Sequence, residues 1–314
     1  MDHFFELPTD EWSKLHYDIR APTSIAQDVL CLLKDYGQGA TFIDSDKAIQ
    51  CELISKFVFE SNAFEGVGDS WLATKACIDS TVCANGPIDN VDEVAMKVEA
   101  FLQAKPADAS QQLKHRQIVQ HLAAYAHMFH SPLEGQWSSV DGIKDLHRVL
   151  TAGLEDADPD ASVQPGHFRS SARYGIGIGQ RVVVYMDHHD IDQAMVEFVE
   201  TMRRHLQISC QLGPNPRMFL LIAHIFYKFL LIHPFGDGNG RMSRLLANHV
   251  LVLHGIRLPV SFVAGKHKRA HAHYSQVLDR AQHKDGNPSR LATFAAEMLS
   301  QTLSAFFTKA AVSL

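Results

Sequence analysis

The chain has 314 residues, 46% hydrophobic and 20% charged, a composition that suits a globular protein with a large core and argues against extensive disorder. Its formal net charge of −6 gives neither an electrostatic footprint for nucleic acid nor a polybasic segment for a membrane surface. The longest apolar run, residues 219–232, is interrupted by His224 and Lys228 and is too short to span a bilayer. We therefore expect neither nucleic acid nor membrane as a partner.

Cysteine usage and the N-terminal residues predict the compartment. The five cysteines are scattered and include no Cys-x-x-Cys pair, which predicts reduced thiols. The segment from Met1 to Glu6 lacks the basic and apolar regions of a signal peptide. The densest histidine groups, around His188 and His271, lack the i, i+4 spacing that places two zinc ligands on one helical face. We expect a cytoplasmic protein without a zinc site.

The N-terminal part of the chain reads as helical. Apolar residues recur at helical spacing from Ser45 to Phe64, and again from Gln111 to His130, where the pattern ends before a proline. Residues 67–110 carry only weak signals. The loop between Ser131 and Ser139 is the best candidate for a boundary, which divides the chain into an N-terminal helical lobe, 1–135, and a core, 136–314.

The core is predicted to be helical with one hairpin. Residues 143–154 and 191–208 have helical periodicity, and residues 266–284 and 291–307 close the chain with two further helices. Glycines and β-branched residues between 174 and 186 predict a β-hairpin. A glycine-rich phosphate loop is the competing interpretation of that stretch, but no helix follows it directly. The fold class is therefore mainly α with a small hairpin.

One polar stretch lies between two apolar runs, 218–232 and 245–253, so that a buried helix is expected to lead into it and another out of it. The stretch reads His233-Pro234-Phe235-Gly236-Asp237-Gly238-Asn239-Gly240-Arg241-Met242-Ser243-Arg244.

Its residue types suit a site that handles phosphate. The three glycines let a ligand approach the main chain, and consecutive amides beside a helix N-terminus form an anion-binding nest. Arg241 and Arg244 are three residues apart, so both can reach one polyphosphate. Asp237 supplies the oxygen ligand that Mg²⁺ prefers. His233 has a solution pKa suited to taking a proton from a hydroxyl near neutral pH. The alternative interpretation is a glycine-rich interhelical turn with a capping Asp or Asn.

These twelve residues resemble the signature of the Fic (filamentation induced by cAMP) family, His-Pro-Phe-x-Asp/Glu-Gly-Asn-Gly-Arg-x-x-Arg, at every defined position. The resemblance implies a Fic-type helical core and transfer of AMP from ATP, with magnesium, to a Ser, Thr or Tyr hydroxyl of a target protein. By resemblance, His233 is the catalytic base and Asp237 the metal ligand. The residues implied in binding the ATP phosphates are Gly236, Gly238, Asn239, Gly240, Arg241 and Arg244.

A second, looser motif ends the helix before residue 67. The segment Ser61-Asn62-Ala63-Phe64-Glu65-Gly66 resembles the Ser/Thr-x-x-x-Glu-Gly/Asn motif of the inhibitory helix that many Fic proteins carry. The resemblance implies that Glu65 pairs with Arg244 and so denies that arginine to the terminal phosphate of ATP. A carboxylate beside a desolvated arginine both satisfies the cation and repels a phosphate. A loop glutamate next to a glycine is also common without any such role.

Two further roles follow from the resemblance. Tyr274 and Gln282 lie near where the family contacts adenine, although relatives carry an asparagine where this chain has Gln282. A core aromatic residue and a solvated helix face are the alternative interpretations of these two. The hairpin at 174–186 is implied as a flap that pairs with an extended segment of the target protein and brings its hydroxyl to His233.

Three rival functions remain at this stage. The same site with Glu65 in place could remove AMP from a modified protein, or it could use another nucleotide donor. Outside enzymes, the chain could be an ATP-sensing interaction module, although binding alone has no need of a base such as His233. The sequence also leaves open whether a symmetric homodimer masks or releases Glu65.

Overall fold

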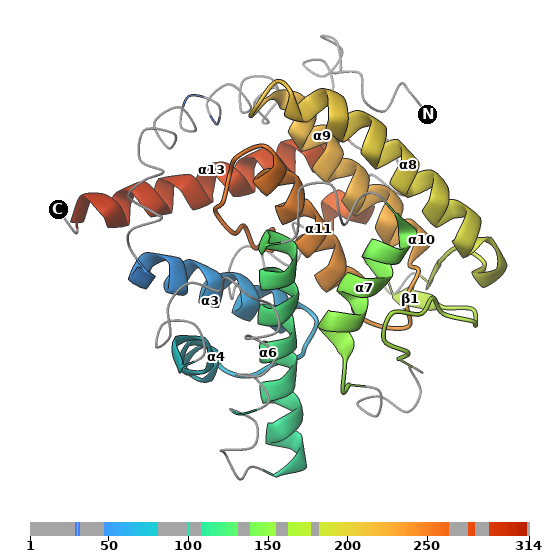
Figure 1. The fold of residues 1–314 in the computed structure, drawn as a ribbon, viewed down its shortest axis with the longest axis horizontal. Helices are drawn as coiled ribbons and strands as arrows, with labels where there is room; N and C mark the ends of the chain where they lie inside the picture. The colour runs from blue at the N-terminus through green and yellow to red at the C-terminus, as the bar shows by residue number, and fades with distance from the viewer. Residues whose placement is uncertain are drawn as a thin grey trace.

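The computed structural model describes residues 29, 31, 47–80, 100, 108–130, 139–154, 163–176, 182–263, 276–279 and 289–312. Within them the chain is mainly α-helical, with one two-stranded antiparallel sheet (Figure 1). The predicted fold class is confirmed. Tyr274 and Gln282, the two residues expected to contact the nucleotide base, lie outside the described residues.

Two buried helical runs form the centre of the molecule. The first comprises α9 (Pro216–His224), the π-helical segment η5 (Ile225–Phe229) and α10 (Leu230–Ile232), and the second is α11 (Asn239–Leu253). The side-chain oxygen of Asn215 caps α9 by accepting a hydrogen bond from the Arg217 amide at 2.9 Å, with Pro216 at the first helical position. Both runs are buried on nearly all sides, as expected of helices inside a core.

The expected helices on either side of the polar stretch are confirmed, but the outgoing helix begins earlier than residue 245. It starts at Asn239, inside the stretch, directly after Gly238. Gly238 adopts the left-handed conformation with φ 78°, which lets the chain turn into the helix at once. Apolar periodicity could not mark this start, because the first turn carries the polar residues of the site.

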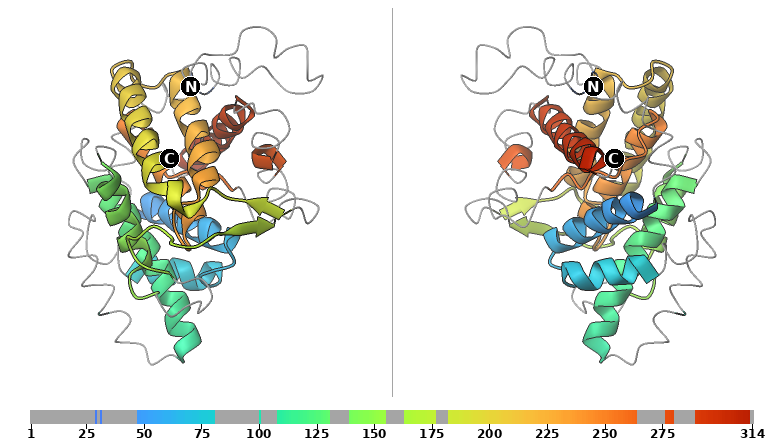
Figure 2. Two further views of the ribbon diagram at one scale, coloured as in Figure 1. Left: turned by 90° about the vertical axis from the view of Figure 1, so that its right-hand side faces the viewer. Right: turned by 90° about the vertical axis from the view of Figure 1, so that its left-hand side faces the viewer.

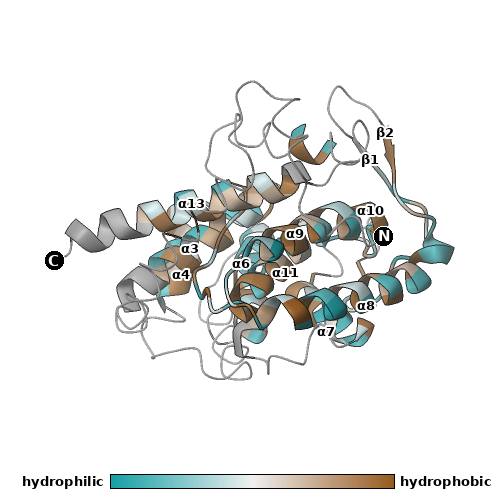
Figure 3. Ribbon diagram, turned by 90° about the horizontal axis from the view of Figure 1, so that it is seen from above, coloured by the Kyte–Doolittle hydropathy of each residue, from teal (hydrophilic) through white to brown (hydrophobic). Residues whose placement is uncertain are grey.

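Two long helices cover the central pair. The helix α8 (Ile191–Cys210) buries a stripe that includes Met195, Phe198 and Met202 and packs on α9. Figure 3 shows both hydrophobic and hydrophilic residues along α8. The helix α13 (Ser289–Val312) also packs on α9. Both helices were expected, with ends that differ by a few residues. Of the helix expected at 266–284, residues 276–279 are described and are helical.

The N-terminal lobe consists of α3 (Lys47–Phe64), α4 (Trp71–Ile78) and α6 (Ala109–His130), which pack on one another. α6 also packs on α7 (Val140–Thr151) and on α11, so that the lobe and the core meet along it. α4 was missed by the sequence analysis because its 8 residues are too short for a periodic pattern. Its N-cap is Ser70, whose hydroxyl accepts from the Ala73 amide at 3.2 Å. The division at residue 135 stays a prediction.

The hairpin expected at 174–186 is confirmed and projects from the helical body (Figure 2). Strand β1 (Tyr174–Ile176) pairs antiparallel with β2 (Val182–Val184), with Gly175 opposite Val183. The short 3-10 helix η4 (His188–Asp190) then leads into α8.

The structure bears on two expectations that came from composition, the absence of a membrane-spanning helix and the reduced state of the cysteines. Among the described helices, none has both the length and the apolar character needed to cross a bilayer. Cys31 and Cys210 are free thiols, whereas Cys51 is disulfide-bonded. The expectation of reduced thiols is therefore wrong at Cys51, because spacing along the chain does not report which side chains meet in space.

Candidate active site

His233 sits at the turn between the two central helical runs. It adopts a left-handed conformation, φ 51° and ψ 60°, that is uncommon for a residue with a side chain. Strain of this kind persists only where the surroundings fix it, and it gathers at functional sites. The Arg169 guanidinium fixes it here, because its Nε donates to the His233 carbonyl at 2.7 Å.

The environment of His233 keeps its imidazole neutral. Its pKa is lowered to about 4, chiefly by burial and also by the charges of Arg169 and Arg173, whereas the Leu230 carbonyl and Asp237 act in the opposite direction. Its Nδ1 lies 3.4 Å from the Leu230 carbonyl, which can only accept a hydrogen bond. The proton is therefore placed on Nδ1, and Nε2 is left as the atom that can take one.

Asn239 and Phe235 brace the loop from inside. The Asn239 amide nitrogen donates to the Phe235 carbonyl at 2.8 Å, and its oxygen accepts from the Phe235 amide at 3.0 Å. The side chain expected to bind phosphate is therefore engaged with the loop itself, and its backbone amide, in the first turn of α11, is what remains for an anion.

His147, on α7, supports the same loop through contacts with Phe235 and Asp237. Its ring stacks on Phe235 with centroids 3.7 Å apart and an angle of 2° between the planes. Its Nδ1 accepts from the Gly166 amide at 3.0 Å, so Nε2 carries the proton and donates to the Asp237 carbonyl at 3.1 Å. Burial lowers the pKa of His147 to about 4, which keeps this arrangement neutral.

The two arginines of the stretch are almost fully buried, with side chains 1% and 0% exposed for Arg241 and Arg244. Arg241 Nη2 donates to Asp237 Oδ2 at 2.7 Å, while its Nε and Nη1 have no hydrogen-bond partner. Arg244 Nη1 also has no partner. Buried guanidinium donors without acceptors are costly, and an anion with several oxygens would satisfy them.

Glu65 reaches this site from the end of α3. Its Oε1 accepts from Arg244 Nη2 at 2.6 Å, and its side chain is 29% exposed. Arg244 also donates from Nε to the Ser61 hydroxyl at 2.7 Å and from Nη2 to the Ser61 carbonyl at 3.0 Å. A Cβ placed on Gly240 would lie 2.9 Å from Glu65 Cδ, so the carboxylate rests directly on the glycine of the nest.

Asp237 is half exposed, and one of its oxygens is bonded to Arg241. Mg²⁺ takes oxygen ligands and commonly combines one or two carboxylates with phosphate oxygens and water. The exposed carboxylate of Asp237 beside unsatisfied arginine donors fits such a shared site. Its role as a metal ligand stays a prediction.

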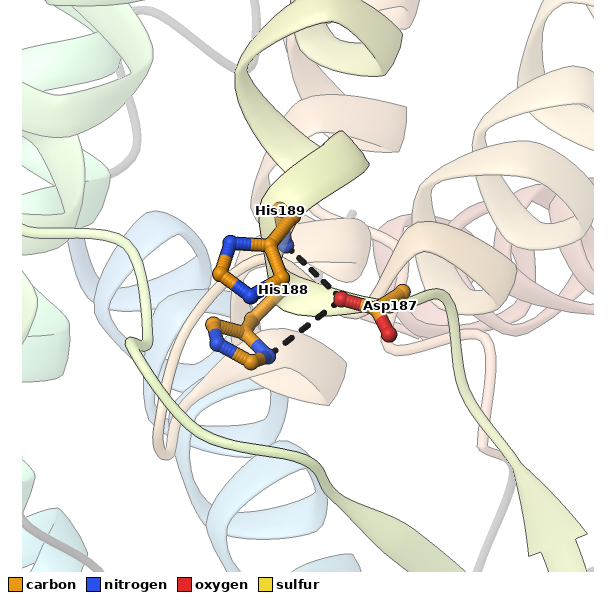
Figure 4. Close-up of side chains that lie close together, drawn as sticks. All are labelled: Asp187, His188 and His189. Carbon is orange, nitrogen blue, oxygen red and sulfur yellow. Dashed lines mark hydrogen bonds and ion pairs between the residues drawn. The ribbon is translucent and has the colours of Figure 1, made fainter.

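A group of three residues at the base of the hairpin also brings metal-ligand atoms together. Asp187, His188 and His189 each have one such atom within 4.8 Å of the others (Figure 4). Asp187 is exposed and accepts from the His189 amide at 3.0 Å, which makes it the cap of η4. Capping accounts for this arrangement, and the expectation of no zinc site here stays a prediction.

The structure brings together distant parts of the expected site. His233, Asp237, the three glycines and the two arginines line one turn and the start of α11, and Glu65 joins them from another helix. Four supporting residues were not assigned by the sequence analysis: Ser61, His147, Arg169 and Tyr185. Ser61 and Tyr185 lie in stretches that the sequence analysis singled out, the motif at 61–66 and the hairpin at 174–186, whereas His147 and Arg169 lie outside them.

Comparisons with known proteins agree with this geometry. The sequence model of the Fic/DOC family matches residues 137–251. A Fido domain-containing protein of Dictyostelium discoideum is 32% identical over 114 residues, which cover 36% of this chain and 73% of that protein. The protein adenylyltransferase fic-1 of Caenorhabditis briggsae is 33% identical over 125 residues, 39% of this chain. The match spans only 21% of that relative's length.

Two solved structures share the fold at low sequence identity. A Fic family protein from Desulfovibrio desulfuricans G20 is similar with a TM-score of 0.65 and 17% identity, covering 94% of this chain and 76% of that one. Fic-1 from C. elegans is similar with a TM-score of 0.62 and 21% identity, covering 92% and 73%.

Proposed function

The chain belongs to the Fic/DOC family, and from this membership we propose that it is a protein adenylyltransferase, which transfers AMP from ATP to a hydroxyl of a target protein. Curated relatives that bear this name match its core at about a third identity. The observation that carries the proposal is one turn of chain that holds a neutral, buried His233 beside a glycine nest and two arginines with unsatisfied donors.

The proposed reaction is a displacement at the α-phosphorus of ATP. The target oxygen forms a bond to that phosphorus, the bond to pyrophosphate breaks, and the hydroxyl proton passes to Nε2 of His233. Arg241, Arg244 and the amides at the start of α11 bind the phosphate oxygens, where negative charge develops. Asp237 would hold Mg²⁺, which supplies further charge neutralisation when it is bound.

The same proposal includes autoinhibition by Glu65. Its carboxylate occupies Arg244 and rests on Gly240, the two places where the nest would receive a phosphate. Phosphate binding would therefore require Glu65 to leave, because two anions cannot share these donors at close range. Glu65 directly follows the last residue of α3, so a movement of the end of that helix would open the nest.

The hairpin supplies the place for the target. The side chains of Tyr174, Val182 and Val184 are more than half exposed, which is unusual for large apolar residues on a projecting hairpin. An extended segment of the target can pair with the free edge of such a hairpin and cover these side chains. The modified hydroxyl type is left to experiment.

The test is self-labelling with α-labelled ATP and Mg²⁺. Glu65→Gly should label about 5- to 150-fold faster than wild type, the range of typical coupling free energies between two sites. Glu65→Gly/His233→Ala should not label at all. Ala63→Gly places a glycine at an exposed position of the same helical turn, and it should label as wild type does.

Other outcomes would count against the proposal. Equal labelling by wild type and Glu65→Gly would remove the inhibitory role. Label that persists after the His233 substitution would remove the base. If no protein labels, a panel of other nucleotide donors and an assay for AMP released from a modified protein would decide between the remaining activities.

A further inference from the structure

Tyr185 lies against the proposed base, although it is far from the signature in sequence. Its ring is parallel to the His233 imidazole, with centroids 3.7 Å apart and an angle of 9° between the planes (the hairpin that leads to it is visible in Figure 1). Tyr185 directly follows strand β2 and is half-buried. No residue of the phosphate-binding turn covers His233 in this way.

The backbone around both rings is fixed by one side chain. Arg169 donates from Nη2 to the Met186 carbonyl at 2.5 Å and from Nε to the His233 carbonyl at 2.7 Å. The Met186 amide in turn donates to the Leu231 carbonyl at 3.4 Å. Since Met186, which follows Tyr185, is tied to the chain that carries His233, a shift of the base of the hairpin would disturb the stack.

The hairpin also makes room for the tyrosine. A Cβ on Gly175 would lie 2.9 Å from Tyr185 Cζ and would collide with the hydroxyl oxygen. The hydroxyl end of the phenol ring therefore lies close to Gly175 of β1, while the ring is stacked on the imidazole. This placement uses three separate segments of chain and is built into the fold.

We propose that Tyr185 is the positioning residue of the base: its ring fixes the plane of the His233 imidazole and closes one face of it to water, so that the ring edge meets the target hydroxyl. The proposal rests on the adenylyltransferase function proposed above. Stacking covers a ring face and leaves the nitrogens at the edge accessible. When His233 takes up the proton, the π-face of Tyr185 lies against the resulting imidazolium, an arrangement that favours the charged form.

Several charged groups lie near the two rings and affect how the protonation of His233 depends on pH. Arg169, Arg173 and Asp237 act on His233, and Glu65 acts on Tyr185, whose pKa is raised chiefly by burial. Loss of the tyrosine ring would act on the pKa of His233 in two opposite directions: water admitted to the ring would raise it from about 4 toward the ordinary value of 6.5, and loss of the π-face would lower it. Because burial is the largest cause of the shift, we expect the net change to be upward.

The test uses the full chain in the Glu65→Gly background, where labelling is measurable. Tyr185→Phe should stay within about threefold of its parent, because it keeps the ring. Tyr185→Leu should lower kcat about 5- to 30-fold, the loss expected for a desolvated cation–π contact, with little change in KM for ATP. Tyr185→Ala should also move the acid limb of the pH profile of kcat upward by one unit or more.

Tyr174→Ala is the matched control. Tyr174 is a tyrosine of the same hairpin that is 63% exposed, and its loss should leave the acid limb where it is, whatever it does to target binding. Circular dichroism and thermal melts check that each variant is folded. A readout without turnover is the NMR titration of the His233 ring, assigned by difference from His233→Ala, whose midpoint should rise in Tyr185→Ala.

The outcomes separate the two proposals. An inactive Glu65→Gly parent would overturn the proposed function, while the NMR titration would still judge the role of Tyr185. An active parent, with Tyr185→Ala equal to it in kcat, in pH profile and in the His233 titration, would overturn the role of Tyr185 alone. The role would also be overturned if Tyr185→Phe lost as much activity as Tyr185→Ala, because keeping the aromatic ring would then make no difference.

Discussion

At the scale of single residues, the proposed inhibition depends on the contacts of Arg244. The same guanidinium that would bind a phosphate is bonded to Glu65 and twice to Ser61, and its side chain is fully buried. Its remaining nitrogen, Nη1, has no partner. Two side chains at the end of α3 therefore hold Arg244, the Glu65 carboxylate and the Ser61 hydroxyl. A substitution can remove the hydroxyl without changing the carboxylate.

Ser61→Ala should raise self-labelling to a level between wild type and Glu65→Gly. It removes the acceptor of Arg244 Nε but leaves the carboxylate in place. A hydrogen bond to a charged group is worth about 1.5–3 kcal/mol, which sets an upper limit of about 10- to 150-fold on the increase. Ser55→Ala is the matched control, because Ser55 is a buried serine of the same helix with no hydrogen bond to lose. An unchanged rate in Ser61→Ala would show that the Ser61 hydroxyl takes no part in holding Arg244.

At the scale of elements, α7 supports the turn between His233 and Asn239. His147 on this helix fixes the Asp237 carbonyl, and α7 packs on α6, so that both lobes contact it. The helix begins at Ser139, whose hydroxyl accepts from the Gly142 amide at 3.2 Å. Its cap is exposed, and its contribution to stability can therefore be measured without disturbing the core.

Ser139→Ala should lower the free energy of unfolding by about 1 kcal/mol, the usual cost of losing an N-cap. Ser139→Asp should keep most of that stability, since a carboxylate caps the amide and also suits the positive end of the helix. Urea denaturation of the three proteins measures the difference. Equal midpoints for alanine and serine would mean that the cap contributes nothing.

At the scale of the whole molecule, buried histidines make the fold sensitive to acid. Burial lowers the pKa of His147 and His249 to about 4 and that of His224 to about 3. Each stays neutral in the folded chain while the unfolded chain protonates it near pH 6.5. The unfolded state therefore binds more protons between about pH 6.5 and 4, and stability falls as the pH falls through that window.

Urea unfolding between pH 7.5 and 5.5 should show this loss. Each such histidine contributes a slope of about 1 kcal/mol per pH unit below pH 6.5. His249→Gln should reduce the slope by about that amount, although its stability at pH 7.5 will also differ. His189→Gln replaces an exposed histidine and should leave the slope unchanged. A stability that does not change down to pH 5 would contradict the assignment of neutral buried histidines.

The sequence by itself determined the helical class and the hairpin, and it predicted the chemistry of one turn. Helical periodicity and β-branched runs are local, and the twelve residues from His233 to Arg244 are contiguous, so all of them can be read along the chain. The pairing of Glu65 with Arg244 was suggested by resemblance. The start of α11 at Asn239 was missed, because its first turn is polar.

Only the tertiary structure decided what surrounds the site. Several contacts join residues far apart in sequence: the stack of Tyr185 on His233, the hydrogen bond from His147 to the Asp237 carbonyl, and the two hydrogen bonds from Arg244 to Ser61. No periodicity or motif encodes such contacts, since they depend on how helices and hairpin pack. The neutral state of His233 likewise follows from burial and from neighbouring arginines, which exist only once the chain is folded.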